Sequence, residues 1–128
     1  RRLLTADEDP NVRAEAANAL ASYGVERSWP LLQAAFSADG AWLVRCSILS
    51  ALAEQPEIQL TWLLELAQMA ITDADGTVRV SGAEILGRIV RDGIAQPIGA
   101  EARALLQPLQ QDVDHRVVAA ALNGLQIS

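Results

Sequence analysis

Few side chains in this sequence could catalyse a reaction or bind a metal. His115 is the single histidine, which excludes a metal site built on two histidines, and its place directly after Asp114 predicts an exposed residue at a helix start rather than a catalytic base. The chain has no lysine, which excludes a Schiff-base lysine and the lysine of a GxxxxGK[ST] phosphate loop. We therefore expect a non-enzymatic chain with no catalytic residues, no metal and no cofactor.

Two further candidates for chemistry are better explained by structure. Cys46 occupies the position held by Ala14, Val80 and Ala119 in related segments, so packing is favoured over a reactive thiol. The stretch DADG at 73–76 lacks the other oxygen ligands and the distal glutamate of a calcium loop, and it predicts a turn followed by a helix cap. A lone cysteine also excludes an internal disulfide, and we expect a cytoplasmic location.

Composition and charge narrow the class of partner. The chain is 51% hydrophobic but only 4% aromatic, with alanine and leucine dominant, which favours closely packed helices in one domain. Its net charge is −6 and its arginines are scattered singly apart from Arg1-Arg2, which disfavours nucleic-acid binding. The longest apolar runs, such as TWLLELAQMAI, are interrupted and too short to span a bilayer. We expect a soluble protein that binds neither nucleic acid nor a membrane.

One pattern recurs four times along the chain. An anchor valine returns after 32, 34 and 39 residues, and each is followed eight residues later by a leucine. Small or apolar residues four and seven positions after each valine complete one face of a helix. Periods of this size predict a solenoid of helical units. The residues expected in its core are Val12, Leu20, Val44, Ile48, Leu52, Val78, Leu86, Val117, Leu122 and Leu125.

Another helix is expected in each unit, because apolar helical patterns also occur between the anchored segments. It is the first helix of the unit, and the anchored helix that follows it is the second. We expect Ser28 to cap the first helix in SWPLLQAAFSAD, with Pro30 in its first turn, and Pro108 to kink or shorten the one in GAEARALLQPLQ. Gly24 and Gly93 fit positions just past helix ends. The fold class is therefore all-α, an α-α superhelix of about four helical hairpins in a single domain, with repeats at approximately 1–24, 25–55, 56–93 and 94–128.

The segment ERSWPLLQAAFSAD and the recurring DxxVRxxAAxAL pattern, best kept in DPNVRAEAANAL, resemble HEAT-like repeats, which also occur in phycobilisome lyases. The resemblance covers nearly the whole chain. It implies a scaffold or adaptor that binds another protein on the concave face of the solenoid. The alternative that it permits is a lyase or chaperone-like subunit handling the bilin chromophore of phycobiliproteins. A DNA-repair glycosylase on such repeats would want a basic concave face, which the scattered arginines disfavour.

Charged residues recur together with the anchors. Asp9, Asp75 and Asp114 stand three residues before an anchor valine, where a carboxylate caps a helix and meets its positive end. Asp39 departs from this pattern, with two extra residues before Val44. We interpret these aspartates as structural caps rather than catalytic acids.

An arginine follows each of the first three anchors, and we expect it to pair with the acidic turn of the next repeat. The predicted pairs are Arg13 with Asp39, Arg45 with Asp73 and Asp75, and Arg79 with Asp112 or Asp114. The fourth copy has Val118 instead, so we expect the array to end near Ser128. The first repeat is expected to be truncated, with residues 1–4 as the remnant of its first helix.

The partner-binding surface is expected on the second helices, at positions two, five and nine residues after the arginine position. These share one face, opposite the anchors, and carry short polar side chains that leave room for a partner. Crowding of inner helices would also explain small residues there. The predicted stripe is Glu15, Asn18, Ser22, Ser47, Ser50, Glu54, Ser81, Glu84, Arg88 and Asn123. Trp62, Leu66 and Met69 form a second candidate patch, for which the alternative is the packed apolar arc of a central helix.

Overall fold

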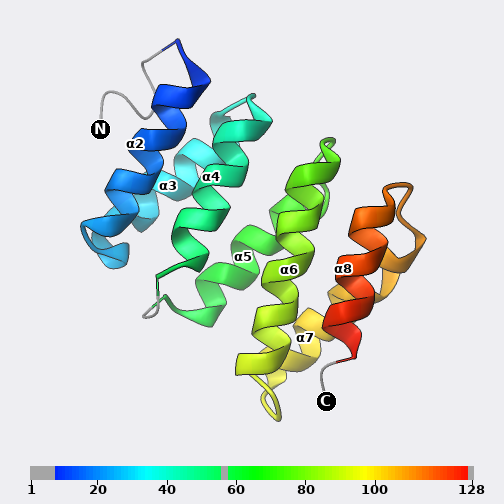
Figure 1. Ribbon diagram of the computed structural model, residues 1–128. Coiled ribbons are helices and arrows are strands. Elements are labelled where there is room, and N and C mark those ends of the chain that lie inside the picture. Colours follow the sequence, from blue (N-terminus) through cyan, green and yellow to red (C-terminus); the bar gives the residue numbers. More distant parts are fainter. Residues whose placement is uncertain (1–7, 56–57, 127–128) are drawn as a thin grey trace. The chain divides into compact units, whose positions relative to one another are not determined.

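The computed structural model describes residues 8–55 and 58–126 of the chain, and all regular structure within them is helical (Figure 1). The predicted all-α class is confirmed. The helical remnant expected at residues 1–4 lies outside the described residues. The chain divides into two compact units, Arg1–Ile58 and Gln59–Ser128. None of the helices in the described ranges is long and apolar enough to cross a lipid bilayer.

The first unit contains α2 (Pro10–Ser22), α3 (Val25–Ala38) and α4 (Trp42–Ala53). Helices α3 and α4 form the predicted hairpin, and α2 packs along α4 (Figure 1). Ala17 and Ala21 on α2 are fully buried, as are Leu32 on α3 and Leu49 on α4. The alanines present little more than backbone surface, so the large side chains of the neighbouring helices can fill the core against them.

Helix α3 begins earlier than the sequence predicts. Its N-cap is Gly24, whose backbone φ of 126° lies in a region that residues other than glycine rarely adopt. The chain can therefore enter the helix directly at Val25. Ser28 is not the cap: it lies inside α3, only 3% exposed, and its Oγ donates a hydrogen bond to the carbonyl oxygen of Gly24 over 2.9 Å. Pro30 is likewise inside the helix rather than in its first turn.

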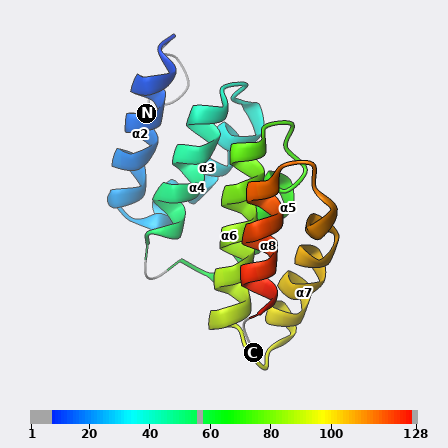
Figure 2. The same ribbon diagram turned by 45° about the vertical axis from the view of Figure 1, so that its right-hand side comes forward.

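The second unit contains α5 (Leu60–Ala70), α6 (Gly76–Asp92), α7 (Pro97–Leu106), the 3₁₀ helix η1 (Gln107–Gln111) and α8 (His115–Leu125). Helix α6 contacts α5, α7 and α8, and it lies side by side with α8 in both views (Figures 1 and 2). Pro108 acts as predicted, because α7 ends at Leu106 and the chain tightens into η1. Gly93 is the C-cap of α6, which is also as predicted.

Small residues bring α6 close to its neighbours on two sides. A Cβ added to Gly82 would lie 2.8 Å from the Cβ of Ala70 and 3.2 Å from the backbone nitrogen of Ile71. On the other side, a Cβ added to Gly124 of α8 would lie 3.2 Å from the Cα of Gly87. The α6–α8 contact is thus nearly backbone to backbone, a separation that only small residues permit.

The anchor pattern predicts most of the core. Six of the ten expected core residues are buried, namely Val44, Ile48, Leu52, Val78, Leu86 and Val117. Three others, Val12, Leu20 and Leu125, are half-buried.

Leu122 is the exception, because its side chain is 42% exposed and the prediction of a buried residue is wrong. The buried positions of α8 are Val117, Ala121 and Gly124, which recur at four- and three-residue intervals on one face. Leu122 projects away from that face.

Candidate functional site

Each of the turns that precede α4, α6 and α8 has an aspartate at the same position. Its carboxylate accepts a hydrogen bond from the backbone N–H two residues later, over 2.8–2.9 Å. The three donor and acceptor pairs are Ala41 to Asp39, Asp75 to Asp73, and Asp114 to Asp112. Asp39 is therefore the counterpart of Asp73 and Asp112, and each of these stands five residues before its anchor valine. The expected insertion between Asp39 and Val44 does not exist.

The capping aspartates are a second, separate set. Asp9, Asp75 and Asp114 are the N-caps of α2, α6 and α8, and the side chain of each accepts from the backbone N–H two residues on. These predictions are confirmed. In α4 the cap position is taken by Ala41, which has no side chain that can accept such a bond. One second helix in the described chain thus lacks the carboxylate that the other three place at their positive ends.

The recurring arginines link consecutive turns within each unit, as predicted for two of the three. Arg13 forms a two-bond pair with Asp39, from Nε to Oδ2 over 2.7 Å and from Nη2 to Oδ1 over 3.1 Å. Arg79 binds Asp112 in the same way, over 2.9 and 3.2 Å. The predicted contact of Arg45 with Asp73 or Asp75 would join the two units and stays a prediction. Within its own unit, Arg45 Nη1 donates to the carbonyl oxygen of Asp39 over 2.8 Å.

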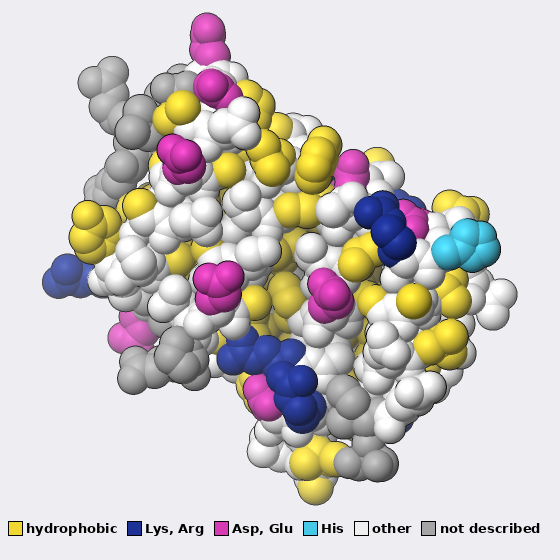
Figure 3. Space-filling view, in the orientation of Figure 1, with side chains coloured by type: hydrophobic (Ala, Val, Ile, Leu, Met, Phe, Trp, Pro, Cys, Tyr) yellow, Lys and Arg dark blue, Asp and Glu magenta, His cyan; other side chains and the backbone are white. Residues whose placement is uncertain are grey.

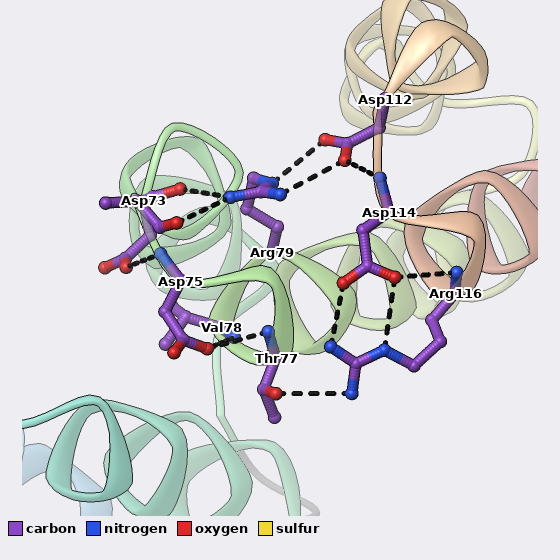
Figure 4. A network of polar contacts seen from close by, with 9 residues as sticks. Asp73, Asp75, Thr77, Val78, Arg79, Asp112, Asp114 and Arg116 are labelled. Carbon is purple, nitrogen blue, oxygen red and sulfur yellow. Dashed lines mark hydrogen bonds and ion pairs between the residues drawn. The ribbon is translucent and has the colours of Figure 1, made fainter.

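Arg79 also binds the turn that precedes its own helix. Its Nη1 donates to the carbonyl oxygens of Asp73 and Ala74 over 2.8 and 3.0 Å, and Figure 4 shows the guanidinium group lying between this turn and Asp112. Beside it, Arg116 binds the capping Asp114 over 2.8 Å and donates to Thr77 Oγ1 over 3.3 Å. The helix starts of α6 and α8 are tied together by these contacts.

The electrostatics of the turns favour ionised carboxylates. Burial raises the pKa of Asp39, but the hydrogen bond from Arg13 and the N–H of Ala41 outweigh it, and the pKa lies below its ordinary value. The pKa of Asp112 is lowered in the same way, since Arg79 and the N–H of Asp114 outweigh burial. Hydrogen bonds from the side chain and backbone of Arg116 lower the pKa of Asp114 to about 2. A carboxylate that stays ionised is suited to capping and ion pairing, not to proton transfer.

The described part of the chain offers little basis for metal binding or thiol chemistry. Within residues 8–55 and 58–126, no cluster of three or more histidine, cysteine, aspartate or glutamate side chains is arranged to hold a metal ion. Cys46 lies on α4 and is half-buried. Because the acidic turns are occupied by arginine and backbone N–H donors, the candidate site lies elsewhere.

The predicted stripe is accessible along both units. In the first unit, α2 carries three exposed stripe residues, and α4 together with its C-cap Glu54 carries two exposed residues and one half-buried residue. In the second unit, two are exposed and two are half-buried. None of the ten is buried. The exposed residues are Glu15, Asn18, Ser22, Ser50, Glu54, Glu84 and Asn123, and the half-buried ones are Ser47, Ser81 and Arg88. In Figure 3, basic and acidic side chains gather over α6 of the second unit.

A pocket of about 230 Å³ lies between α6 and α8 of the second unit. Three of the predicted stripe residues, Glu84, Arg88 and Asn123, are brought together around it, and Arg91 completes its polar lining. The sequence reasoning missed Arg91 because it counted only nine residues beyond Arg79. Helix α6 is longer than the other second helices, 17 residues against 11 to 13. The spacing of residues 84, 88 and 91 along one helical face could have revealed it.

The charges around this pocket are unevenly placed. Arg88 and Arg91 share the carboxylate of Asp92, which lies 3.2 Å from Nε of Arg88 and 3.4 Å from Nε of Arg91. The side chain of Arg88 is 20% exposed and that of Arg91 is 63% exposed. Glu84 lies one turn before Arg88, so the lining is acidic toward the start of α6 and basic toward its end.

The second candidate patch is not an exposed surface. Leu66 is fully buried, and Trp62 and Met69 are half-buried. The three residues therefore do not form an open apolar patch on α5. The alternative, a wide apolar arc that packs into the fold, describes them better.

Comparison with known families identifies the N-terminal part of the chain. Residues 1–53 match the family model of HEAT repeats, so this segment is a HEAT-repeat region. The hairpins α5–α6 and α7–α8 further along are consistent with HEAT-like helical repeats. HEAT repeats typically mediate protein binding. No curated protein and no solved structure matches the chain.

Proposed function

We propose that this chain is a protein-interaction module that binds its partner along the stripe of polar residues on its second helices. The observation that carries the proposal is the pocket between α6 and α8, which gathers three residues of the stripe, Glu84, Arg88 and Asn123, around one hollow. Specific binding sites combine a concave shape with a few converging polar groups. The HEAT-repeat match over residues 1–53 supports the same class of function.

The composition of the stripe supports binding over solvation alone. It consists mainly of serine, asparagine and glutamate, and six of its ten members are serine or asparagine residues with short side chains. Short side chains lose little conformational entropy when a partner immobilises them, whereas long charged ones lose more. A partner can therefore approach the helix backbones at low entropic cost. The stripe residues of α2 lie beside those of α4, and those of α6 beside that of α8.

The proposal is tested by placing long charged side chains on the stripe. The double variant Ser50→Arg with Ser81→Arg should lose capture of the native partner from a cell lysate, while its melting temperature stays close to that of the unaltered chain. The matched control is Ala34→Arg with Ala104→Arg, which adds the same charge at exposed positions of the first helices α3 and α7. Capture retained by the stripe variant, or lost equally in the control, would place the interaction elsewhere.

A further inference from the structure

We propose that the pocket between α6 and α8 binds an extended segment of the partner that carries one acidic and one basic residue two positions apart. This inference rests on the proposed function and specifies the chemistry of the partner. It follows from three properties of the pocket: the small residues of its floor, the length over which α6 lines it, and the order of the charges along that length.

The floor of the pocket is made of small residues on both helices. Ala83 and Gly87 line it from α6, and Ala120 and Gly124 line it from α8. Gly87 and Gly124 approach so closely that a Cβ on Gly87 would lie 3.4 Å from the Cα of Gly124. A main chain laid along this floor meets no long side chain beneath it. Extended segments are one of the forms in which proteins recognise peptides, and an extended main chain can lie along this floor.

The length of the pocket sets how much of a segment it can hold. Helix α6 lines it from Ala83 to Arg91, which corresponds to about 12 Å at 1.5 Å per residue. An extended chain advances about 3.3 Å per residue, so three to four residues of the partner fit. In such a segment, alternate side chains point the same way and are about 6.6 Å apart. Glu84 and Arg88 are separated along the helix axis by about 6 Å, which matches this spacing.

The charges then select the side chains. A carboxylate on the partner is attracted to Arg88 and Arg91, and Asn123 on the opposite wall can donate a hydrogen bond to it. A basic residue two positions away is attracted to Glu84. Two acidic residues at this spacing are disfavoured, because one of them faces Glu84. Asp92 holds both arginines from outside the pocket lining, so it orders the guanidinium groups without filling the site.

The test uses three blocked peptides, each acetylated and amidated: Gly-Asp-Ala-Lys-Gly, the uncharged Gly-Asn-Ala-Gln-Gly, and the doubly acidic Gly-Asp-Ala-Asp-Gly. Each is titrated into isotope-labelled protein while the amide signals of Gly87 and Gly124 are followed by NMR. The acidic–basic peptide should shift both signals in a saturable manner and bind at least about threefold more tightly than the other two. Equal binding of all three peptides, or no saturable shift with the first, overturns the proposal.

Variants show whether the charges of the pocket are responsible. Arg88→Gln should weaken the acidic–basic peptide at least about threefold, and Arg91→Gln provides a second test at a more exposed side chain. Arg27→Gln, at an exposed position of α3, is the matched control and should have no effect. Glu84→Gln should strengthen binding of the doubly acidic peptide, an effect that a merely structural role would not produce. If Glu84→Gln leaves that peptide unchanged, the selection by charge is refuted.

The two proposals can fail separately. Neither Ser50 nor Ser81 lines the pocket, so the stripe variant tests the surface without altering the pocket charges. If the native partner is lost with Ser50→Arg and Ser81→Arg but is retained by a variant carrying Glu84→Gln with Arg88→Gln, the stripe binds the partner and the pocket inference is wrong. If the stripe variant retains the partner, the proposed function itself fails.

Discussion

The contact most open to a quantitative test is the bridge that Arg79 makes between two turns of the second unit. Its guanidinium group forms two bonds with the carboxylate of Asp112 and donates to the carbonyl oxygens of Asp73 and Ala74. The side chains of Arg79 and Asp112 are only 15% and 11% exposed. In Arg79→Gln the shorter, neutral side chain cannot span both turns, so Asp112 loses its charged partner.

The size of the effect follows from this geometry. A hydrogen bond to a charged group contributes about 1.5–3 kcal/mol, while an exposed ion pair contributes about 1 kcal/mol or less. The Arg79 bridge falls in the first of these ranges, because both side chains are mostly covered. Asp112 keeps the hydrogen bond from the N–H of Asp114, which limits the loss. We therefore expect Arg79→Gln to lower the free energy of unfolding by about 2–3 kcal/mol. For a chain of this size that corresponds to a loss of roughly 8–12 °C in melting temperature.

The assay is thermal and urea unfolding followed by circular dichroism, with Arg91→Gln as the matched control. Arg91 is 63% exposed and lies 3.4 Å from Asp92, which it shares with Arg88. The same substitution there should change the free energy of unfolding by about 0.5 kcal/mol or less. If Arg79→Gln and Arg91→Gln are equally mild, the bridge does not stabilise the packing of consecutive turns and the reasoning is wrong.

Three further predictions concern stability. The pKa of Asp112 is lower in the folded chain than in the unfolded chain, so the unfolded state binds more protons. The stabilisation by Asp112 is fully present above the unfolded pKa of about 4 and should be lost as the pH falls through the folded pKa. Asp112→Asn should flatten this acid dependence in urea titrations, and an unchanged slope would contradict the prediction. The same sign applies to Asp39 in the first unit. Gly82→Ala should lower the free energy of unfolding by about 1–2 kcal/mol through overpacking against α5. Gly87→Ala, whose added Cβ would lie 3.4 Å from the nearest atom, should be neutral or stabilising by up to about 1 kcal/mol. Equal melting temperatures for the two variants would contradict this difference in packing. Ala41→Asp should supply the missing cap of α4 and raise the denaturation midpoint, with a gain of about 0.5–1 kcal/mol, and a midpoint at or below that of the parent would argue against a cap there.

The helices could be predicted from the sequence because their signals are local. The anchor valines and leucines mark one face of each second helix, and the aspartates three residues before the valines cap α2, α6 and α8 as expected. Pro108 ends α7 for a reason confined to its own ring and missing N–H. Local rules also misled once: Ser28 has the right chemistry for a cap, but Gly24 enters the helix one turn earlier.

Part of the candidate site was also predictable, since helical spacing places Glu84 and Arg88 on one face of α6. The pocket itself was not, because it depends on how closely α8 approaches. That distance is set by Gly87 and Gly124, which are far apart in the sequence. Arg91 joins the site only because α6 continues beyond the length of its counterparts.

Periodicity and charges that recur in register were enough to predict the helical class, the spacing of the repeats and the pairing of Arg13 and Arg79 with the turns that follow. Which surfaces are covered depends instead on how the helices pack. Leu122 has the residue type and approximate register of a core position yet remains 42% exposed, and Leu66, offered as a surface residue, is fully buried. Burial is a property of what packs against a side chain, and a helical pattern specifies which residues share a face without specifying which neighbour covers it.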